Sequence, residues 1–185
     1  MGPLVILDRD GVINEDSDAY IKSAAEWRPV PGSLEAIARF NRAGYTVVVA
    51  SNQSGLGRKL FDLRALGAIH ARMRKELAAA GGRIDAIFFC PHHPDAGCSC
   101  RKPADGLFRQ IAERFQISLA GVPAIGDSLR DLQAARSAGA MPMLVLTGKG
   151  AGAQMAAEAE GVPVYGNLEA ACDAILDPQI HGHHL

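Results

Sequence analysis

Short apolar runs rich in branched side chains recur along the chain, and turn-forming residues bound each of them. They predict buried strands over residues 4–7, 46–50, 84–89, 122–125 and 143–146. Between these runs, apolar side chains recur every three or four residues, which is typical of amphipathic helices. Apolar strands that alternate with helices indicate a mostly parallel sheet with helices on both faces. The pattern therefore predicts the α/β fold class, as a three-layer α/β/α sandwich with a Rossmann-like sheet.

The chain length indicates one domain. The chain has 185 residues, of which 48% are hydrophobic, and a domain typically has about 100 to 200 residues. We expect a single domain over residues 1–178 and a flexible tail over residues 179–185. The stretches from Asp10 to Ser51 and from Ser51 to Lys102 leave no room for a large cap domain, so short loops should cover any cleft.

The charge balance argues against several classes of partner. There are 19 basic and 20 acidic residues, giving a formal net charge of -1, and aromatic residues make up 5%. Binding to nucleic acid normally needs a basic excess, or aromatic side chains on which bases stack. The first residues lack a signal-peptide pattern, and no window resembles a membrane span. We expect a cytoplasmic monomer that binds neither nucleic acid nor membrane.

Polar side chains follow four of the predicted strands where each strand ends. Asp8 and Asp10 follow the first, residues 51–53 the second, Cys90 the third and Asp127 the fourth. A single aspartate at such a place is more often a helix cap. However, the carboxyl ends of parallel strands meet at one edge of a sheet, where ligands bind. The sequence therefore predicts that these four ends converge on one cleft.

The acidic residues in this cleft suit phosphoryl chemistry with a magnesium ion. Asp8 and Asp10 are two residues apart, and Gly11 permits a tight turn after them. Two carboxylates this close, with Asp127 as a third, favour a shared hard cation such as Mg²⁺. Asp8 could then attack phosphorus and form an aspartyl phosphate, while Asp10 protonates the leaving oxygen and later deprotonates water.

Three further side chains could stabilise a phosphorylated substrate. Phosphoryl transfer depends on donors placed around the equatorial oxygens. Ser51 offers a hydroxyl and Lys102 an ammonium group for this purpose. Arg101 has a planar fork that suits a second anionic group on the substrate. The alternative for Arg101 and Lys102 is a solvated surface pair.

A loop after the third strand carries a set of metal-binding side chains. Cys90, His92, Cys98 and Cys100 form a Cys₃His set, the composition of a closed structural zinc site. A disulfide is the alternative, but a reducing compartment disfavours it. The loop runs directly into residues 101–102, so a bound zinc would fix the direction of those two cations.

The ordered motifs resemble those of the haloacid dehalogenase-like phosphatases. The match consists of residues 8–12, Ser51 after an apolar strand, Lys102, and residues 126–131. The resemblance implies Asp8 as nucleophile, Asp10 as general acid and base, and Ser51 and Lys102 as phosphoryl stabilisers. It also implies Mg²⁺ held by Asp8, by Asp10 through its backbone carbonyl, and by Asp127. Asp131 would support this site or would be an exposed helix acid.

Four stretches narrow the resemblance to the D-glycero-D-manno-heptose 1,7-bisphosphate phosphatases. They are residues 7–14, 51–55, 90–94 and 100–103. This family removes the 7-phosphate on the route to ADP- or GDP-heptose for lipopolysaccharide or surface glycans. The resemblance implies a small phosphorylated sugar as the substrate, and the following substrate contacts: Asp16, Ser17, Asp18, Tyr20, Asn52, Gln53, Ser54, Arg101 and Ser128. The chain departs from the family pattern in having Ser51 where threonine is common, one residue more near Asp16, and a short zinc loop.

Two other functions remain open at this point. Histidinol-phosphate phosphatases of the same superfamily carry a similar cysteine loop, but they tend to have an acid where this chain has Ser54. A receiver-like phosphoacceptor domain would also use acids, Mg²⁺, a hydroxyl and a lysine. Such a domain has its acceptor aspartate after the third strand, where this chain has Cys90 instead.

Several remaining features are predicted to be structural. Residues 148–152 are glycine-rich but lack the full phosphate-loop pattern, so we interpret them as a mobile loop. Cys172, Trp27 and Phe40 are expected in the core. His93 is the spare imidazole of the cysteine loop.

Overall fold

The computed structural model describes residues 2–177, so the predicted tail over residues 179–185 lies outside the described residues. Six strands form one sheet in which every pairing is parallel. The strands are β1 (Leu4–Leu7), β2 (Thr46–Asn52), β3 (Ala86–Cys90), β4 (Pro123–Gly126), β5 (Met141–Val145) and β6 (Val164–Tyr165). Their order across the sheet is β3-β2-β1-β4-β5-β6.

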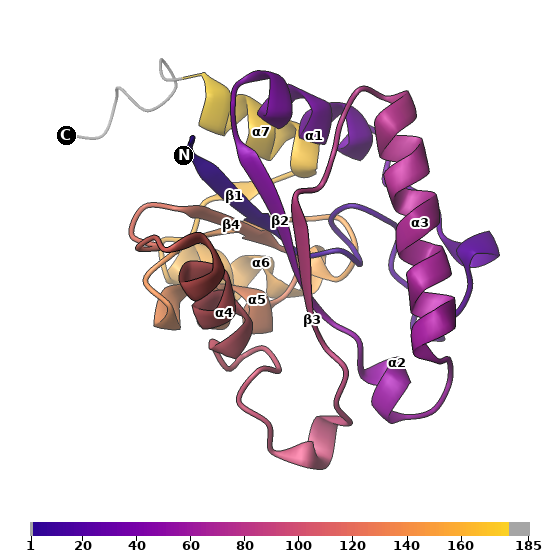
Figure 1. Ribbon diagram of the computed structural model, residues 1–185. Helices are drawn as coiled ribbons and strands as arrows, with labels where there is room; N and C mark the ends of the chain where they lie inside the picture. Colours follow the sequence, from indigo (N-terminus) through magenta and orange to yellow (C-terminus); the bar gives the residue numbers. More distant parts are fainter. Residues whose placement is uncertain (1, 178–185) are drawn as a thin grey trace.

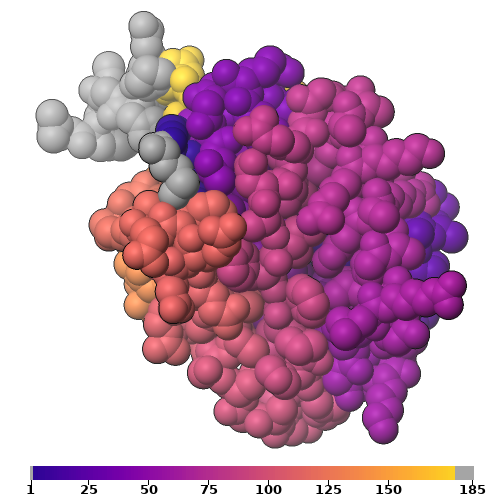
Figure 2. Space-filling view, in the orientation of Figure 1, coloured from indigo at the N-terminus to yellow at the C-terminus, as the bar shows by residue number. Residues whose placement is uncertain are grey.

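Helices cover both faces of this sheet, so the predicted three-layer sandwich is confirmed (Figure 1). The α-helices are α1 (Ser33–Arg42), α2 (Ser54–Gly57), α3 (Leu63–Ala79), α4 (Gly106–Phe115), α5 (Leu129–Ser137), α6 (Gly150–Ala159) and α7 (Leu168–Leu176). Two short 3-10 helices are η1 (Ala24–Glu26) and η2 (Pro94–Ala96). In the space-filling view, the segment around η2 forms one end of the molecule (Figure 2).

Alternate side chains of β1 belong to two different apolar layers. Val5 and Leu7 belong to the layer that packs against α1, α3 and α7, whereas Leu4 and Ile6 belong to the layer under α4 and α5. Successive side chains of a strand point to opposite faces, so β1 is apolar throughout because it is buried on both sides. The first layer contains Trp27, Phe40 and Cys172, all with no exposed surface. The prediction that these three residues are in the core is confirmed.

The order of the strands places a crevice at the end of β1. The chain runs outward from β1 to β2 and β3, and then returns to the other side of β1 as β4. The backbone N–H of Asp8 donates to the carbonyl of Ile125 (2.9 Å) and joins the two strand ends. The connections leaving β1 and β4 depart in opposite directions, and this topological switch point is where open α/β sheets bind ligands.

Some predicted elements differ from the structure. The interpretation of residues 148–152 as a mobile loop is wrong, because α6 begins at Gly150. The position of Ser33 before an apolar periodic segment makes it a possible helix cap, but it does not cap α1: Gly32 precedes the helix with a φ of 81°, and the Ser33 hydroxyl donates to the carbonyl of Ile13 (2.6 Å). Strand β5 begins before the expected apolar run and includes Pro142, which hid its first residues from the pattern.

The connections between strands are short. Within residues 2–177, the segments between β1 and β2 and between β2 and β3 contain only η1, α1, α2, α3 and loops. The cleft at the strand ends is therefore open on that side, as expected for a chain without a large cap. In the same range, none of the helices has the length and apolar character needed to cross a membrane.

Candidate active site and metal centre

A cleft of about 420 Å³ lies at the carboxyl ends of β1, β2 and β4. Most of the predicted site residues line it: Asp8, Asp10, Asp16, Ser17, Asp18, Tyr20, Asn52, Gln53, Ser54, Arg101, Lys102, Asp127 and Ser128. Ser51 is not among the lining residues and is 1% exposed. Side chains from distant parts of the sequence are thus brought to one place by the ends of the parallel strands.

Asp8 is held by two donors at the end of β1. The backbone N–H of Arg9 donates to its Oδ1 (2.7 Å), and Nζ of Lys102 lies 3.1 Å from the same oxygen. Burial raises the pKa of Asp8 well above its usual value, and three neighbouring carboxylates raise this pKa further, against the opposing charge of Lys102. An additional cation at this place would favour the ionised form, which is the form that can act as a nucleophile.

Asp10 lies in a ring of donors. Its Oδ1 accepts from Nε (3.1 Å) and Nη2 (2.8 Å) of Arg9 and from Nδ2 of Asn14 (2.9 Å), while its Oδ2 accepts from Nε2 of Gln53 (3.0 Å). Burial alone would raise the pKa of Asp10, but the charge of Arg9 and these hydrogen bonds lower it. Asp10 is therefore an ionised carboxylate with a fixed orientation.

Lys102 is a buried ammonium with three partners. Its Nζ donates to the carbonyl of Ala50 (2.7 Å) and lies close to the carboxylates of Asp131 (2.6 Å) and Asp8 (3.1 Å). Burial by itself would lower the pKa of Lys102, but the two carboxylates raise it. Two hydrogen bonds of 3.0 Å between the Asn52 side chain and the Lys102 backbone fix this lysine beside the end of β2.

Asp127 fits between two glycines. A Cβ on Gly11 or on Gly148 would clash with its carboxylate, and both glycines have positive φ values, 81° and 58°. The backbone N–H of Lys149 donates to Oδ2 of Asp127 (2.8 Å). Burial, and after it the charges of neighbouring carboxylates, raises the pKa of Asp127 to about 7. The glycine-rich segment before α6 thus packs against the predicted magnesium ligand.

Carboxylate oxygens of Asp8, Asp127 and Asp131 lie within 4.8 Å of one another. Both oxygens of Asp131 already have a protein partner: Oδ1 is paired with Lys102, and Oδ2 accepts from the Ser128 hydroxyl (2.6 Å). Asp8 and Asp127 are therefore the carboxylates best placed to hold a hard cation. Four carboxylates and two cationic side chains meet here and together carry two net negative charges, which one divalent cation would balance. They are Asp8, Asp10, Asp127 and Asp131, with Arg9 and Lys102. The donor set fits Mg²⁺, with the Asp10 carbonyl as the predicted third ligand.

Three polar residues at the end of β2 support their neighbours. Nε2 of Gln53 bridges the Ser51 hydroxyl (2.9 Å) and Oδ2 of Asp10 (3.0 Å), and Gln53 is only 4% exposed. Asn52 uses its amide on the Lys102 backbone. These amides hold the predicted acid/base and phosphoryl-stabilising groups, while their contacts with substrate stay a prediction.

Cationic side chains surround the outer part of the cleft. Besides Lys102, they are Arg58, Arg101, Arg130 and Lys149. Nη1 of Arg101 is buried and has no hydrogen-bond partner among the described residues. Nζ of Lys149 lies 3.3 Å from Asp16 and 3.4 Å from Asp18. The charge of this rim suits an anionic substrate, and a contact of Arg101 with one of its anionic groups stays a prediction.

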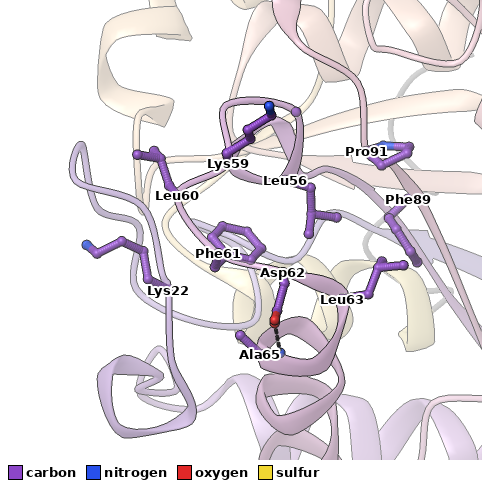
Figure 3. A pocket seen from close by; sticks show the side chains of 11 residues that line it. Lys22, Leu56, Lys59, Leu60, Phe61, Asp62, Leu63, Ala65, Phe89 and Pro91 are labelled. Atoms are coloured by element: carbon purple, nitrogen blue, oxygen red, sulfur yellow. Dashed lines mark hydrogen bonds between the residues drawn. The ribbon is translucent and has the colours of Figure 1, made fainter.

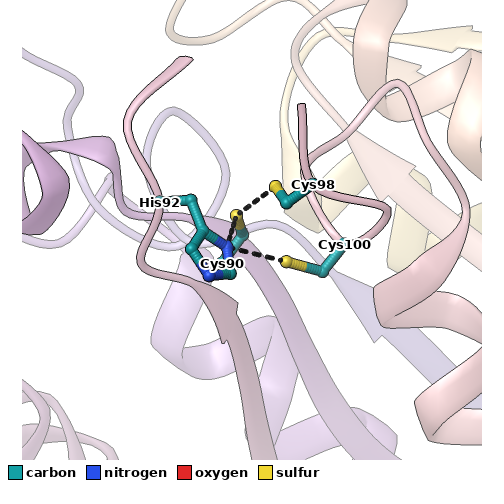
Figure 4. Close-up of side chains that lie close together, drawn as sticks. All are labelled: Cys90, His92, Cys98 and Cys100. Carbon is teal, nitrogen blue, oxygen red and sulfur yellow. Dashed lines mark hydrogen bonds between the residues drawn. The ribbon is translucent and has the colours of Figure 1, made fainter. Parts of the chain in front are cut away.

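The four predicted zinc ligands come together after β3, as Figure 4 shows. Sγ of Cys90 lies 3.6 Å from Sγ of Cys98 and 3.5 Å from Nδ1 of His92, which is 3.2 Å from Sγ of Cys100. A zinc tetrahedron with bonds of about 2.0 to 2.3 Å has edges of roughly 3.5 to 3.8 Å. The cluster therefore has nearly the right size for zinc. His93 is outside it, and its Nδ1 accepts from the N–H of Asp95 (3.2 Å).

A larger groove of about 900 Å³ lies elsewhere, beside α2 and the start of α3 (Figure 3). It is lined mainly by apolar side chains, among them Leu56, Phe61, Leu63 and Phe89. Its one acid, Asp62, accepts from the N–H of Ala65 (2.8 Å) as the cap of α3. The groove offers no converging charged groups, so the smaller polar cleft is the candidate active site.

Comparisons with known proteins find relatives along most of the chain. A family model described as Polynucleotide kinase 3 phosphatase matches residues 4–127, and one described as HAD-hydrolase-like matches residues 99–171. A D-glycero-beta-D-manno-heptose-1,7-bisphosphate 7-phosphatase from Bordetella bronchiseptica is 63% identical over 147 residues, which cover 80% of this chain and 82% of the relative. The chain belongs to this phosphatase family.

Two further comparisons support this assignment. A phosphatase of the same name from Pseudomonas aeruginosa is 51% identical over 173 residues, covering 94% of this chain and 97% of its own length. The crystal structure of D,D-heptose 1,7-bisphosphate phosphatase from B. bronchiseptica, complexed with magnesium and phosphate, superposes with a TM-score of 0.91 at 56% identity and covers 95% of this chain and 98% of that chain. The family resemblance inferred from the motifs is thus confirmed.

Sequence reasoning missed several residues of the site. Sequence reasoning assigns no role to Arg9, yet this residue is fully buried and paired with Asp10. Lys149 lies in the segment predicted to be a mobile loop, yet it contacts Asp16 and Asp127. The available signal for Arg9 is that it is the lone cation within an acidic motif. The position of Lys149 depends on the pairing of β5 with β4 and on the start of α6 at Gly150.

Proposed function

We propose that this chain is a Mg²⁺-dependent phosphomonoesterase that removes the 7-phosphate of D-glycero-β-D-manno-heptose 1,7-bisphosphate. The observation that carries the proposal is the cluster of Asp8, Asp10, Lys102 and Asp127 at the switch point of the sheet. Family membership supports it, as do the names of relatives that act on this substrate. A route to ADP- or GDP-heptose would consume the product.

In the first half of the reaction, a carboxylate oxygen of Asp8 attacks phosphorus and the bond to the sugar oxygen breaks. Lys102 and the Arg9 N–H hold Asp8 in one orientation for this attack. Bound Mg²⁺, held by Asp8, Asp127 and the Asp10 carbonyl, would screen the repulsion between nucleophile and phosphate. For this step Asp10 has to carry a proton taken from solvent, and it passes this proton to the leaving oxygen as the bond between phosphorus and the sugar oxygen breaks.

In the second half, Asp10 removes a proton from water, and the oxygen of that water attacks the aspartyl phosphate. The phosphorus–Asp8 bond breaks, so inorganic phosphate leaves and the Asp8 carboxylate is restored. Ser51 and Lys102 are proposed to stabilise the phosphoryl oxygens in both halves. The lowered pKa of Asp10 supports its part here, because an ionised carboxylate can act as a base.

The cationic rim supports a substrate with two phosphates. With one phosphate at Asp8, the second needs a cation at the outer part of the cleft, and Arg101 has a buried donor without a partner there. Asp16, Ser17, Asp18, Tyr20, Ser54 and Ser128 are proposed to contact the sugar. The zinc cluster lies immediately before Arg101 in the sequence, and we propose that Zn²⁺ at this cluster positions the arginine.

A turnover comparison tests the substrate. The purified protein is assayed for phosphate release from both anomers of the heptose bisphosphate and from histidinol phosphate, with Mg²⁺ and with a chelator. We expect the β anomer to be preferred and activity to require Mg²⁺. A preference for histidinol phosphate would overturn the proposal, as would a stable phosphoprotein without turnover. Histidinol phosphate has an amine, and Ser54 gives that amine no counter-charge.

We also propose that the protein is a monomer in the cytoplasm. The cleft is complete within one chain, and a zinc site with three thiolates requires reduced cysteines, as in a reducing compartment. Light scattering during gel filtration tests the first statement, and a second copy in the particle would contradict it. Cell fractionation tests the second, and recovery in the membrane or periplasmic fraction would contradict it.

A further inference from the structure

Arg9 has no exposed surface, although its side chain carries a permanent charge. A buried charge is tolerated only when it is paired and hydrogen-bonded. Its partner is Asp10: Nε lies 3.1 Å from Oδ1, and Nη2 lies 2.8 Å from Oδ1 and 3.0 Å from Oδ2. Because the guanidinium group is a planar fork, these three contacts fix the plane of the carboxylate as well as its distance.

The far side of Arg9 is held by His70 of α3. Nη1 of Arg9 lies 3.4 Å from Nε2 of His70. An arginine can only donate, so Nε2 must accept, and the ring hydrogen is on Nδ1. Burial, followed by the charge of Arg9, lowers the pKa of His70 to about 4, which is consistent with a neutral ring. The rings of His70 and Phe89 also pack in a T-shaped arrangement, with ring centres 6.3 Å apart.

Two buried cations thus serve different carboxylates of the site. Lys102 contacts Asp8 and Asp131, while the side chain of Arg9 contacts Asp10. We propose that Arg9 is a positioning residue for Asp10 and that His70 positions Arg9. The inference rests on the proposed function, since Asp10 must be the acid/base for its position to matter.

The consequence for the reaction follows from the contacts of Asp10. The same carboxylate must reach the leaving oxygen in the first half and the water in the second. A displacement of about 1 Å in such a group can cost roughly 100-fold in rate. Lysine in place of Arg9 would keep the charge but would lose the planar fork and the contact with His70. With a leaving group that needs no proton, only hydrolysis of the aspartyl phosphate depends on Asp10, so this half should slow most.

Rapid-quench kinetics with p-nitrophenyl phosphate and Mg²⁺ separate the two halves. The burst of p-nitrophenol reports phosphoryl transfer to Asp8, and this leaving group departs without needing a proton. The steady rate that follows reports hydrolysis of the aspartyl phosphate, for which Asp10 is the base. For Arg9→Lys we expect a burst near one per folded protein and a steady rate lower by about 10- to 100-fold. If the amplitude of the burst and the steady rate fall in equal proportion, or if neither of them falls, the inference is overturned.

If Arg9→Lys does not fold, a pair of His70 variants tests whether the contact between His70 and Arg9 matters for hydrolysis of the aspartyl phosphate. His70→Phe keeps a ring beside Phe89 and removes the acceptor, whereas His70→Gln keeps an acceptor. We expect a steady rate about 3- to 10-fold lower for His70→Phe, with the burst retained, and a return toward the native rate for His70→Gln. Equal rates for these two variants would contradict the role of His70.

Asp10→Asn separates this inference from the proposed function. If Asp10→Asn slows hydrolysis of the aspartyl phosphate and Arg9→Lys does not, only the role of Arg9 is overturned. If Asp10→Asn leaves both halves at the native rate, Asp10 is not the acid/base, and the proposed mechanism fails as well.

Discussion

The ammonium of Lys102 lies 2.6 Å from Oδ1 of Asp131, and both side chains are less than a tenth exposed. Asp131 accepts from the Ser128 hydroxyl through its other oxygen and closes a capping box at the start of α5. The aspartate therefore joins the first turn of a helix to the lysine of the β3–α4 connection. Of the two interpretations of Asp131, support of the site agrees with this geometry.

Asp131→Asn should destabilise the fold because it leaves Lys102 with Asp8 as its only carboxylate partner. Removing one member of a buried ion pair costs about 3 to 5 kcal/mol when the other charge is left unpaired, and less, about 1 to 3 kcal/mol, when a partner remains, as Asp8 does here. We expect a fall in this lower range in the free energy of unfolding, measured by urea denaturation. The matched control is Glu160→Gln, which breaks the Arg136–Glu160 ion pair. Its N–O distance is also 2.6 Å, but both of its side chains are about half exposed. The control should change stability by less than about 1 kcal/mol, and equal losses for both variants would contradict the prediction.

Asp8→Asn should abolish turnover and leave the protein folded. The amide is a poor nucleophile, so no aspartyl phosphate can form. Burial disfavours the Asp8 charge, so its removal should cost little stability. Phosphate release and thermal unfolding are measured on the same sample. Turnover near the native rate would remove Asp8 from the mechanism.

The stabilisation of the folded protein by Mg²⁺ should increase as pH rises from about 6 to 8. The pKa of Asp127 is raised to about 7 in the metal-free fold, against a usual 3.8. A raised pKa means that this group favours the fold most at low pH, and that its contribution is lost as pH rises toward 7. Mg²⁺ binds the ionised carboxylate and competes with the proton, so its effect grows over the same interval. The increase in Tm caused by Mg²⁺ is measured at several pH values.

The control for this measurement is Asp127→Asn, which cannot ionise at that position. Its Tm should respond weakly to Mg²⁺ at every pH. A native protein whose response to Mg²⁺ is the same at pH 6 and pH 8 would show that protonation of Asp127 does not limit binding.

Cys98→Ala should loosen the loop that carries Arg101. The variant removes one of four ligands, so bound zinc should fall below one per chain in elemental analysis. We expect KM for the heptose bisphosphate to rise more than KM for p-nitrophenyl phosphate, which has no second phosphate for Arg101. Cys172→Ala is the matched control, because Cys172 is buried in the core away from the cluster. Equal increases in both KM values would contradict a positioning role for the zinc loop.

The strand ends could be predicted from the sequence because β1, β2 and β4 are apolar runs that stop at a polar residue. Asp8, Ser51 and Asp127 follow from that pattern, and the parallel order of the strands brings them together. The spacing of Cys90, His92, Cys98 and Cys100 likewise indicated their cluster, since short loops keep such side chains close.

Other parts depend on packing that leaves no local pattern. Strand β6 has two residues, too few for any periodicity, and α6 begins in a glycine-rich segment that resembles a loop. The hydrogen bond from Lys149 to Asp127 joins residues 22 positions apart across β5. The contact of Arg9 with His70 spans 61 positions and requires α3 to lie against the end of β1. Such pairs become visible only when the helices are placed on the sheet.

The zinc loop is fastened at both of its ends. Cys90 belongs to β3, whose last residues pair with β2, and the Lys102 backbone is clamped by Asn52 of that same strand. Residues 93–97, with η2, bulge outward between the two fixed points. Insertions or deletions there would be absorbed by the bulge and would leave the ammonium of Lys102 in place. Variation in the length of this loop is thus compatible with an unchanged position of Lys102 beside Asp8.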